Sequence, residues 1–243
     1  MKLFGLLGKN IDYSFSRSYF SEKFRKEAIN AEYRNFDIAE IGQFESVIQQ
    51  NEDLKGLNVT IPYKQSVMDY LDRLDENAEA IGAVNTVKIE EDKSLTGYNT
   101  DYVGFTAAIK PMLKNGNYRA LILGTGGASK AVAFAFQKLG IKYLYVSRKP
   151  GPDQVSYQDL NEEILQKYKI IINTTPLGTF PNTEDHPDIP YHYLTQDHLA
   201  YDLIYNPSTT KFMELAAKNG ASTSNGLQML QLQAEKAWEI WNI

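Results

Sequence analysis

The chain of 243 residues contains no cysteine, which excludes disulfides, thiolate chemistry and cysteine-bound metals and fits a reducing compartment. Its formal net charge of -5 and its pI of about 5.3 leave no basic stripe, so we expect no nucleic-acid partner. No apolar run approaches the roughly 20 residues that span a bilayer, and the run from Met1 to Gly8 is too short for a signal peptide. These absences predict a cytoplasmic protein that does not associate with membranes.

Apolar and polar segments alternate along the whole chain, and its 43% hydrophobic residues suffice for one large domain or two small ones. The expected strands are 2–8, 31–38, 56–61, 83–90, 120–123, 143–147, 170–173 and 199–204. The expected helices are 18–31, 44–50, 66–74, 102–113, 128–139, 161–168, 210–218 and 227–241. Such alternation predicts an α/β fold with parallel sheets and crossover helices, in two α/β blocks.

The most informative stretch is a glycine turn between a strand and a helix. Residues 121–123 predict a buried strand, and the small residues after Gly126 open a helix. Gly124 permits a tight turn, Gly126 lets the backbone approach a pyrophosphate, and the N–H groups of the helix start face the phosphates. Ser129 takes the third position, where a small residue still lets helix and strand pack. An ordinary tight turn without a ligand is the alternative.

Polar residues of the first block gather at expected strand ends and short loops: Ser14, Ser16, Thr60, Lys64, Asn85, Asn99 and Asp101. In a doubly wound sheet such ends form the ligand crevice, so this group is suited to a small polyhydroxylated molecule. A carboxylate beside Lys64 would hold its ammonium, which could then exchange a proton with a substrate oxygen. From the residues alone, the alternative is a solvated Lys64 at a helix start and an Asp101 that only caps its neighbour.

Eight segments, in order over nearly the whole chain, resemble the motifs of the shikimate dehydrogenase family. They are Asn58–Lys64 (NVTIPYK), Gly82–Val87 (GAVNTV), Gly97–Asp101 (GYNTD), Gly124–Ser129 (GTGGAS), Val146–Arg148 (VSR), Ile172–Gly178 (INTTPLG), Asp202–Pro207 (DLIYNP) and Gly226–Ala234 (GLQMLQLQA). The resemblance implies an N-terminal substrate domain (1–101 plus 222–243), a Rossmann-like NADP domain (102–221) and a cleft between them.

The resemblance also implies roles for individual residues. Lys64 and Asp101 would form a catalytic dyad. Thr60, Asn85 and Asn99 would bind the ring hydroxyls of the substrate, Gln233 would reach it from the last helix, and Tyr205 would lie near its carboxylate. The residues expected at the cofactor are Gly124, Gly126, Gly127, Ala128, Ser129, Ser147, Arg148, Lys149, Thr174, Gly226 and Met229.

The loop after the first strand departs from the family pattern. The family has a His-Ser-x-Ser-Pro run, whereas this chain has Tyr13-Ser14-Phe15-Ser16-Arg17. Ser14 and Ser16 keep the hydroxyl pair that would hold a carboxylate, which needs two or more donors to replace its hydration. Loss of the histidine and the proline leaves the shape of this loop and the choice between shikimate and a relative such as quinate open.

The end of the second strand of the second block favours NADP over NAD. An NAD site carries an acidic residue about 20 residues past the glycines, but this position holds Ser147, Arg148 and Lys149. The guanidinium of Arg148 presents a planar fork to phosphate oxygens and stacks on adenine. The alternative is that Arg148 and Lys149 are ordinary solvated cations.

The expected reaction is therefore the reversible, NADP-dependent reduction of 3-dehydroshikimate to shikimate in aromatic amino acid biosynthesis. Lys64 would give the proton to the oxygen of the ring ketone, and Asp101 would orient the Lys64 side chain. The alternatives are a quinate or other shikimate-like dehydrogenase, and a dinucleotide-binding regulatory module without catalysis. We expect no metal, because the spacing of six between His186, His192 and His198 suits neither one helix face nor a compact chelate, and we interpret them as loop residues exposed to water. We expect a monomer or homodimer.

Overall fold

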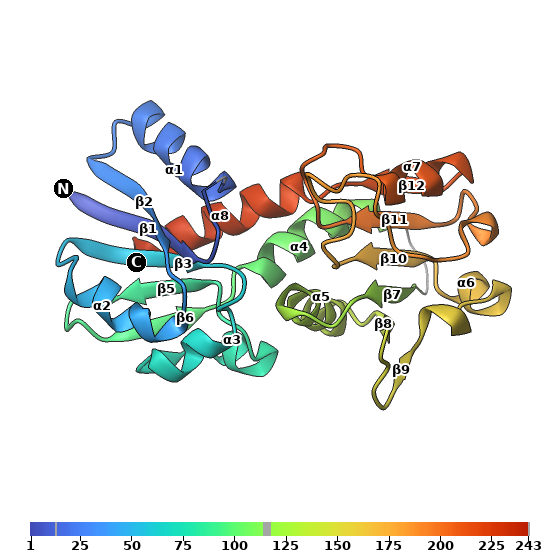
Figure 1. Ribbon diagram of the computed structural model, residues 1–243, viewed down its shortest axis with the longest axis horizontal. Helices are drawn as coiled ribbons and strands as arrows, with labels where there is room; N and C mark the ends of the chain where they lie inside the picture. Colours follow the sequence, from blue (N-terminus) through green and yellow to red (C-terminus); the bar gives the residue numbers. More distant parts are fainter. Residues whose placement is uncertain (13, 114–117, 243) are drawn as a thin grey trace. The chain divides into compact units, whose positions relative to one another are not determined.

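The computed structural model describes residues 1–12, 14–113 and 118–242, and the chain forms two compact units (Figure 1). The first unit comprises Met1–Thr100 and Gln233–Ile243, and the second comprises Asp101–Leu232. Residues 222–232 were expected in the first block. In the structure, β12 (Ser222–Ser224) pairs in parallel with β11 (Leu199–Asp202) and extends the sheet of the second unit, to which residues 225–232 also belong. Tyr13, at which the sequence departs from the family pattern, lies outside the described residues.

The first unit contains one sheet with the strand order β2-β1-β3-β5-β6-β4. Its strands are β1 (Lys2–Gly8), β2 (Ala31–Asp37), β3 (Leu54–Val59), β4 (Arg73–Leu74), β5 (Thr86–Ile89) and β6 (Leu95–Tyr98). Its helices are α1 (Phe15–Lys26), α2 (Phe44–Gln49) and α3 (Glu76–Ile81), with 3-10 turns η1 (Ile41–Gln43) and η2 (Ser66–Tyr70). The last helix, α8 (Leu227–Trp241), contributes its residues from Gln233 onward to this unit.

The sheet of the first unit is mixed, and the expectation of a parallel sheet is wrong for this block. β5 pairs antiparallel with both β3 and β6. The reason is a tight reversal between β5 and β6, where the N–H of Glu90 donates to the Ser94 carbonyl oxygen over 2.9 Å. So short a connection can only form a hairpin, whereas parallel neighbours need a long crossover. The helix expected over residues 66–74 is the short turn η2 followed by β4.

Side chains of β1 alternate between the two faces of this sheet, as the strand period requires. Leu3 and Leu7 join the cluster formed with α2, η2 and α3. Phe4 and Leu6 join the cluster formed with α1 and α8, in which the Trp241 ring stacks on Phe4 with centroids 4.9 Å apart. Both tryptophans, Trp238 and Trp241, thus pack the last helix onto the sheet.

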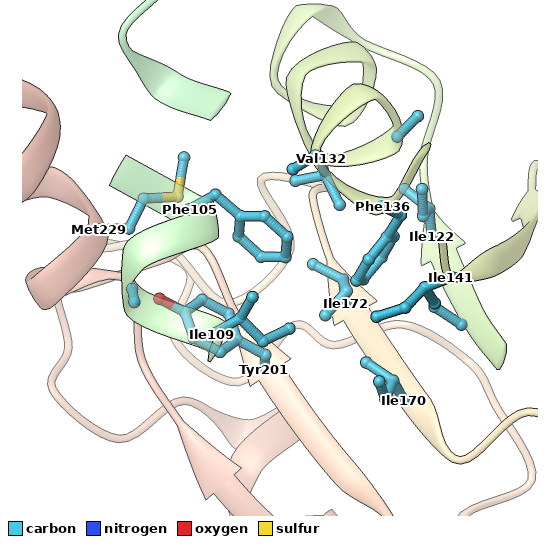
Figure 2. Packing of buried hydrophobic residues seen from close by; sticks show 14 residues of the cluster. Phe105, Ile109, Ile122, Val132, Phe136, Ile141, Ile170, Ile172, Tyr201 and Met229 are labelled. Carbon is cyan, nitrogen blue, oxygen red and sulfur yellow. The ribbon is translucent and has the colours of Figure 1, made fainter. Parts of the chain in front are cut away.

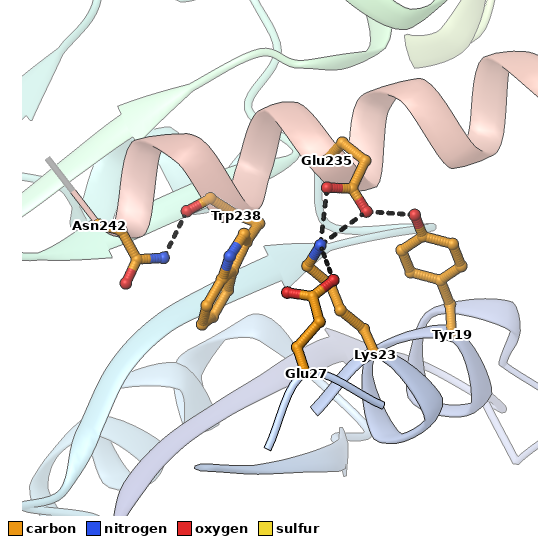
Figure 3. Close-up of polar contacts among 6 residues, drawn as sticks. All are labelled: Tyr19, Lys23, Glu27, Glu235, Trp238 and Asn242. Atoms are coloured by element: carbon orange, nitrogen blue, oxygen red, sulfur yellow. Dashed lines mark hydrogen bonds and ion pairs between the residues drawn. The ribbon is translucent and has the colours of Figure 1, made fainter. Parts of the chain in front are cut away.

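Polar contacts also tie α8 to α1 (Figure 3). The Glu235 carboxylate of α8 accepts hydrogen bonds from the Tyr19 hydroxyl and, over 2.9 Å, from the Lys23 ammonium of α1. Lys23 also binds Glu27 over 2.9 Å, and its side chain is only 12% exposed. These contacts hold the stretch of α8 that follows Gln233 against the first unit.

The second unit contains one parallel sheet with the strand order β12-β11-β10-β7-β8-β9. Its remaining strands are β7 (Arg119–Leu123), β8 (Lys142–Val146), β9 (Gln154–Val155) and β10 (Ile170–Asn173). Its helices are α4 (Asp101–Ile109), α5 (Gly127–Lys138), α6 (Glu162–Lys167) and α7 (Lys211–Lys218), with 3-10 turns η3 (Lys110–Met112), η4 (Tyr157–Asp159) and η5 (Tyr191–Tyr193).

Counted from β7 as the first strand to β12 as the sixth, this order is 6-5-4-1-2-3, the doubly wound order of dinucleotide-binding folds. Strands β7 and β10 carry side chains to both faces: Ile122 and Ile172 pack under α4 and α5 (Figure 2), whereas Leu121 and Ile171 pack with α6 and α7. The predicted α/β class is confirmed. The order in which successive strands are added to the sheet reverses between β7 and β10, and such folds bind ligands at that point.

Candidate functional site

The polar residues of the first unit lie at one edge of its sheet. Thr60 and Lys64 follow β3, and Asn99 follows β6, which runs parallel to β3. Asn85 precedes β5, which runs the opposite way, so its start lies at this same edge. The backbone confirms the neighbourhood: the N–H of Asn85 donates to Tyr98 over 3.1 Å, and Asn85 accepts from Val59 over 2.8 Å.

Three buried side chains at this edge form a hydrogen-bond network. The Asn85 amide donates to the Thr100 hydroxyl over 3.0 Å and to the Gln233 amide oxygen over 3.3 Å. The Asn85 amide oxygen accepts the backbone N–H of Thr100 over 2.6 Å. Asn85, Thr100 and Gln233 are 3%, 0% and 5% exposed. Two of the predicted substrate residues, Asn85 and Gln233, are therefore brought together, and Thr100 joins them without having been predicted.

Lys64 and Asn99 lie on either side of the segment that leads to Asn85. The carbonyl oxygen of Lys64 accepts the N–H of Val84 over 2.7 Å, and the Asn99 amide donates to Ala83 over 2.9 Å. The N–H of Thr60 donates to Leu7 over 2.9 Å, which ties the loop after β3 to the end of β1. The family motifs around residues 58–64, 82–87 and 97–101 thus describe one physical neighbourhood.

The two serines predicted to hold a carboxylate lie at the start of α1. Ser14 is the N-cap, and its hydroxyl accepts the N–H of Arg17 over 3.4 Å. Ser16 is 8% exposed and hydrogen-bonds Tyr33, whose hydroxyl also donates to Asn58 over 2.7 Å. Arg17 is exposed.

Asp101 is the first residue of α4 and is 6% exposed. It opens the second unit, whereas Lys64 belongs to the first. The dyad of Lys64 and Asp101 therefore stays a prediction.

The glycine turn follows β7 and opens α5, as predicted. Gly124 has φ of +102°, which favours glycine, and its N–H donates to Val146 over 2.9 Å. Gly126 is the N-cap of α5, and no side chain caps this helix end. The first-turn N–H groups of a helix have no partner within the helix, so the turn offers donors to an anion. Ser129 is 1% exposed, and its hydroxyl donates to the Gly126 carbonyl oxygen over 2.6 Å.

A cavity of about 540 Å³ lies at the carboxyl ends of β7, β8 and β10. It is lined by residues 124–126, 146–148, 157–158, 174–177 and by His186 and Asp188. A Cβ added to Gly126 would meet no atom of the protein within 4 Å. The glycine is therefore not needed for internal packing, and a side chain there would fill the space beside the uncapped helix end. Together with the Arg148 guanidinium in the same cavity, these features fit the phosphates of a dinucleotide.

Ser147 and Arg148 line this cavity directly after β8, where the sequence analysis placed them. The exposed Arg148 is close enough to Tyr157 for its charge to lower the pKa of that phenol, although burial outweighs it and leaves the pKa raised. Lys149 is exposed, and its N–H donates to the Ser147 hydroxyl over 3.2 Å. The strand end therefore presents a hydroxyl and cations, and no carboxylate follows β8 directly.

Of the other predicted cofactor residues, Thr174 lines this cavity, whereas Gly226 and Met229 do not. The Thr174 hydroxyl donates to the Leu123 carbonyl oxygen over 2.6 Å, which fixes the end of β10 beside the glycine turn. A Cβ on Gly226 would lie 2.0 Å from the Leu203 carbonyl oxygen, so only glycine allows α8 to begin there. Met229 is 7% exposed and packs with Phe105 (Figure 2). Tyr205 lies in the loop after β11 and is half-buried.

A buried carboxylate, Asp202, holds the loops around β10 and β11. It accepts the Asn173 amide over 3.1 Å, the N–H of Ile204 over 3.0 Å and the Thr210 hydroxyl over 2.6 Å. Burial raises the pKa of Asp202 to about 6, against the lowering effect of these hydrogen bonds. Sequence reasoning found Asp202 only as part of a motif and gave it no role.

The histidines differ from expectation at one position. His198 was expected in water but is 2% exposed: its Nε2–H donates to Leu165 over 2.8 Å, and its Nδ1 accepts the N–H of Thr195 over 2.9 Å. Burial lowers its pKa, so it is a neutral core residue. Among residues 1–12, 14–113 and 118–242, no group of three or more histidine, aspartate or glutamate side chains is placed to hold a metal ion. In the same ranges, no helix is long and apolar enough to cross a bilayer.

Comparison with known proteins was made at three levels. Residues 6–87 match the family model described as the shikimate dehydrogenase substrate binding domain. A shikimate dehydrogenase (NADP(+)) of Methanococcus maripaludis is 39% identical over 260 residues, which cover 99% of this chain and 91% of the relative.

Solved structures share the whole fold. A crystal structure of shikimate dehydrogenase in complex with NADP+ aligns with a TM-score of 0.88 and 33% identity, covering 99% of this chain and 90% of the other. A quinate dehydrogenase from Corynebacterium glutamicum in complex with NAD aligns with a TM-score of 0.87 and 27% identity, covering 99% and 93%.

Proposed function

This chain belongs to the shikimate dehydrogenase family, and from that premise we propose that it catalyses the reversible, NADP-dependent reduction of 3-dehydroshikimate to shikimate. It is an oxidoreductase of the pathway to aromatic amino acids. The observation that carries the proposal is the pairing of two sites in one chain. One is a polar edge suited to a ring with several hydroxyls, and the other is a cavity suited to a dinucleotide with a 2′-phosphate.

The preference for NADP rests on the end of β8. A 2′-phosphate needs cations and hydroxyl donors, and Ser147, Arg148 and Lys149 supply both. An NAD site would carry an acidic residue there to bind the ribose hydroxyls. Ser147 and Arg148 line the same cavity as Gly124 and Gly126, so one ligand can use the glycine turn for its pyrophosphate and the β8 end for its 2′-phosphate.

The bound cofactor supplies the hydride; the chain supplies position and a proton. We assign the proton to the Lys64 ammonium, which gives it to the ketone oxygen of the substrate as the carbonyl becomes an alcohol. In the reverse direction the neutral Lys64 amine takes the proton back. Asp101, buried at the first turn of α4, would keep the ammonium charged and aimed, since a nearby carboxylate favours the charged form.

The remaining side chains of the first unit bind the substrate in this proposal. Asn85 and Gln233 are already oriented by their hydrogen bonds to each other and to Thr100. Polar groups that are fixed before binding lose little conformational entropy when the ring hydroxyls arrive. Ser14 and Ser16 would take the substrate carboxylate, and Tyr205 would approach it from the second unit.

The proposal is tested by the nicotinamide absorbance of purified protein mixed with NADP+ and shikimate. We expect the reduced band to appear with shikimate and NADP+, more slowly with NAD+, and more slowly with quinate, which carries an additional ring hydroxyl. Faster turnover of quinate would assign the chain to quinate oxidation instead. Binding of NADP+ without turnover of either acid would favour a regulatory module.

We further propose that the chain acts in the cytoplasm as a monomer or a homodimer, without a nucleic-acid partner. The lack of cysteine suits a reducing compartment, and the net charge of -5 disfavours polyanions. Light scattering on the eluting protein would give the oligomeric state.

A further inference from the structure

The cofactor cavity has a wall to which neither the sequence motifs nor the proposed function gives a role. His186 and Asp188, from the long connection between β10 and β11, line the same cavity as Ser147 and Arg148. The motifs that carry the family resemblance end at Gly178 and resume at Asp202. This wall is therefore a feature of the present chain that the site description leaves without a function.

The segment that carries both residues is anchored to the core. Pro187 is buried between them, and its carbonyl oxygen accepts the Tyr191 hydroxyl over 2.7 Å and the N–H of Ile189 over 3.0 Å. Ile189 is 4% exposed and belongs to the hydrophobic cluster of α6 and α7. Because its neighbours are fixed, the Asp188 carboxylate is presented at the cavity from a constrained backbone.

The two side chains bring different groups to this wall. The Nδ1–H of His186 donates to the Glu184 carbonyl oxygen over 3.1 Å. The Asp188 carboxylate accepts only. Its charge contributes, after burial and Asp202, to the raised pKa of Tyr191, which places it near that phenol.

The position of this wall identifies the part of the dinucleotide that meets it. In a doubly wound sheet the pyrophosphate lies at the helix after the first strand, and the adenosine half extends over the end of the second strand. Here these elements are α5 and β8, so the cavity shared by Gly126, Arg148 and Asp188 receives the adenosine half. A carboxylate beside the 2′-phosphate would repel it. Asp188 therefore suits a hydrogen-bond donor of the adenosine half that lies away from this phosphate, and the exocyclic amine of the base is such a donor.

We propose that Asp188 recognises the adenine of the cofactor by accepting a hydrogen bond from its exocyclic amine, with His186 beside it in the same wall of the cavity. This inference rests on the proposed function, because it presumes that NADP occupies the cavity. It makes Asp188 a specificity-determining residue for the base. A cofactor whose base carries a carbonyl oxygen at that position would set two acceptors against each other.

The test compares the affinity for NADP+ with that for its hypoxanthine analogue, in which oxygen replaces the adenine amine, by titration calorimetry without the second substrate. For the wild type we expect NADP+ to bind about tenfold more tightly, the range of one hydrogen bond to a charged group. Asp188→Ala should lose most of this preference by weakening NADP+ binding alone. Asp188→Asn can donate to the carbonyl of the analogue, so its preference should fall further or reverse.

The matched control is Asp185→Ala, an exposed acid of the same segment that does not line the cavity; it should keep the wild-type preference. Equal affinities of the wild type for both cofactors would overturn the inference, as would an Asp188→Ala variant that weakens both cofactors equally. In either case, wild-type turnover of shikimate with NADP+ would leave the proposed function standing. A wild type that binds neither dinucleotide would refute both.

Discussion

The two candidate sites of this chain are built in opposite ways. In the first unit, the buried side chains of Asn85, Thr100 and Gln233 bind one another. In the second unit, the glycine turn at Gly126 is exposed, and no side chain caps the helix that follows. The first arrangement is set by folding itself, because buried polar groups must find partners within the protein. The second leaves its donors for an incoming anion.

This difference predicts two kinds of mutational effect. A change within the polar network of the first unit should lower both stability and substrate affinity, since the same hydrogen bonds serve both. A change at the glycine turn should lower cofactor affinity and affect stability less. Residues that act only in the chemical step should affect neither property.

The largest effect is expected for Lys64→Ala, which tests the chemical step alone. Loss of a general acid typically costs about 10²–10⁴-fold in rate, so kcat should fall within that range while the KM for shikimate changes little. Steady-state kinetics in both directions measure this. Lys55→Ala, at the other end of β3, should keep wild-type turnover. A Lys64→Ala enzyme with full kcat would remove this lysine from the mechanism.

The next effect concerns Arg148, the cation at the edge of the cofactor cavity. Arg148→Glu replaces a phosphate donor by a carboxylate that suits ribose hydroxyls, so the ratio of kcat/KM for NADP over NAD should fall about 100-fold. Kinetics with both cofactors measure the ratio. Lys142→Glu makes the same charge change at the exposed start of β8, where the ratio should not move. An unchanged ratio in Arg148→Glu would assign the 2′-phosphate to other residues.

Elements whose cause lies in neighbouring residues could be predicted from the sequence, whereas features that depend on distant contacts could not. Strand β7, the glycine turn and α5 were predictable because 121–123 are contiguous apolar residues and the glycines follow directly. The hairpin between β5 and β6 was missed, although the polar run from Glu90 to Ser94 between Ile89 and Leu95 is a turn signal. The burial of His198 and the place of Asp188 depend on how Ile189 and Leu194 pack in the core, which no local pattern encodes.

The residues of the candidate site could be predicted from the sequence more readily than the hydrogen bonds that join them. Asn85 and Gln233 were found as separate motif positions, 148 residues apart, and the structure joins them by a hydrogen bond. Thr100 was passed over because the resemblance gives roles to its neighbours Asn99 and Asp101 and none to Thr100. Tyr157 and Gln158 were not found because they belong to η4, behind a strand of only two residues.

A pair of alanine substitutions compares the two sites directly. Asn85→Ala leaves the buried N–H of Thr100 without its acceptor, which should cost about 2 kcal/mol of unfolding free energy and raise the KM for shikimate. Gly126→Ala adds a Cβ that meets no protein atom, at an ordinary φ of -78°, and should cost about 0.5–1 kcal/mol, because alanine is a poorer N-cap than glycine. Its affinity for NADP+ should nevertheless fall about tenfold, because the Cβ occupies the phosphate site.

Urea unfolding and calorimetric binding, measured on both variants, separate these effects. The comparison fails if Gly126→Ala is the less stable of the two, or if it binds NADP+ like the wild type. Asn85→Ala should bind NADP+ with wild-type affinity, because its network belongs to the other unit.

The last effect concerns Asp202, a carboxylate buried in the second unit, and is a change of stability with pH. Its pKa is raised by burial from 3.8 to about 6, so between these values the folded state binds more protons than the unfolded state. Its contribution to stability therefore falls as the pH rises through that window. Asp202→Asn keeps an acceptor for Ile204 and Asn173 and removes the titration. The stability of the variant relative to wild type should rise by about 2 kcal/mol from pH 4 to pH 7.

Two signals can assign this effect to one unit. Both tryptophans, Trp238 and Trp241, belong to the first unit, so tryptophan fluorescence follows its unfolding, whereas circular dichroism follows both units. If the units unfold separately, the pH-dependent difference between Asp202→Asn and wild type should be seen by circular dichroism and be absent from the fluorescence midpoint. If they unfold together, it should be seen in both. A difference that stays constant from pH 4 to pH 7 in both signals would show that folding leaves the pKa of Asp202 at its ordinary value. The three hydrogen-bond donors of Asp202 would then fully offset the effect of burial on that pKa.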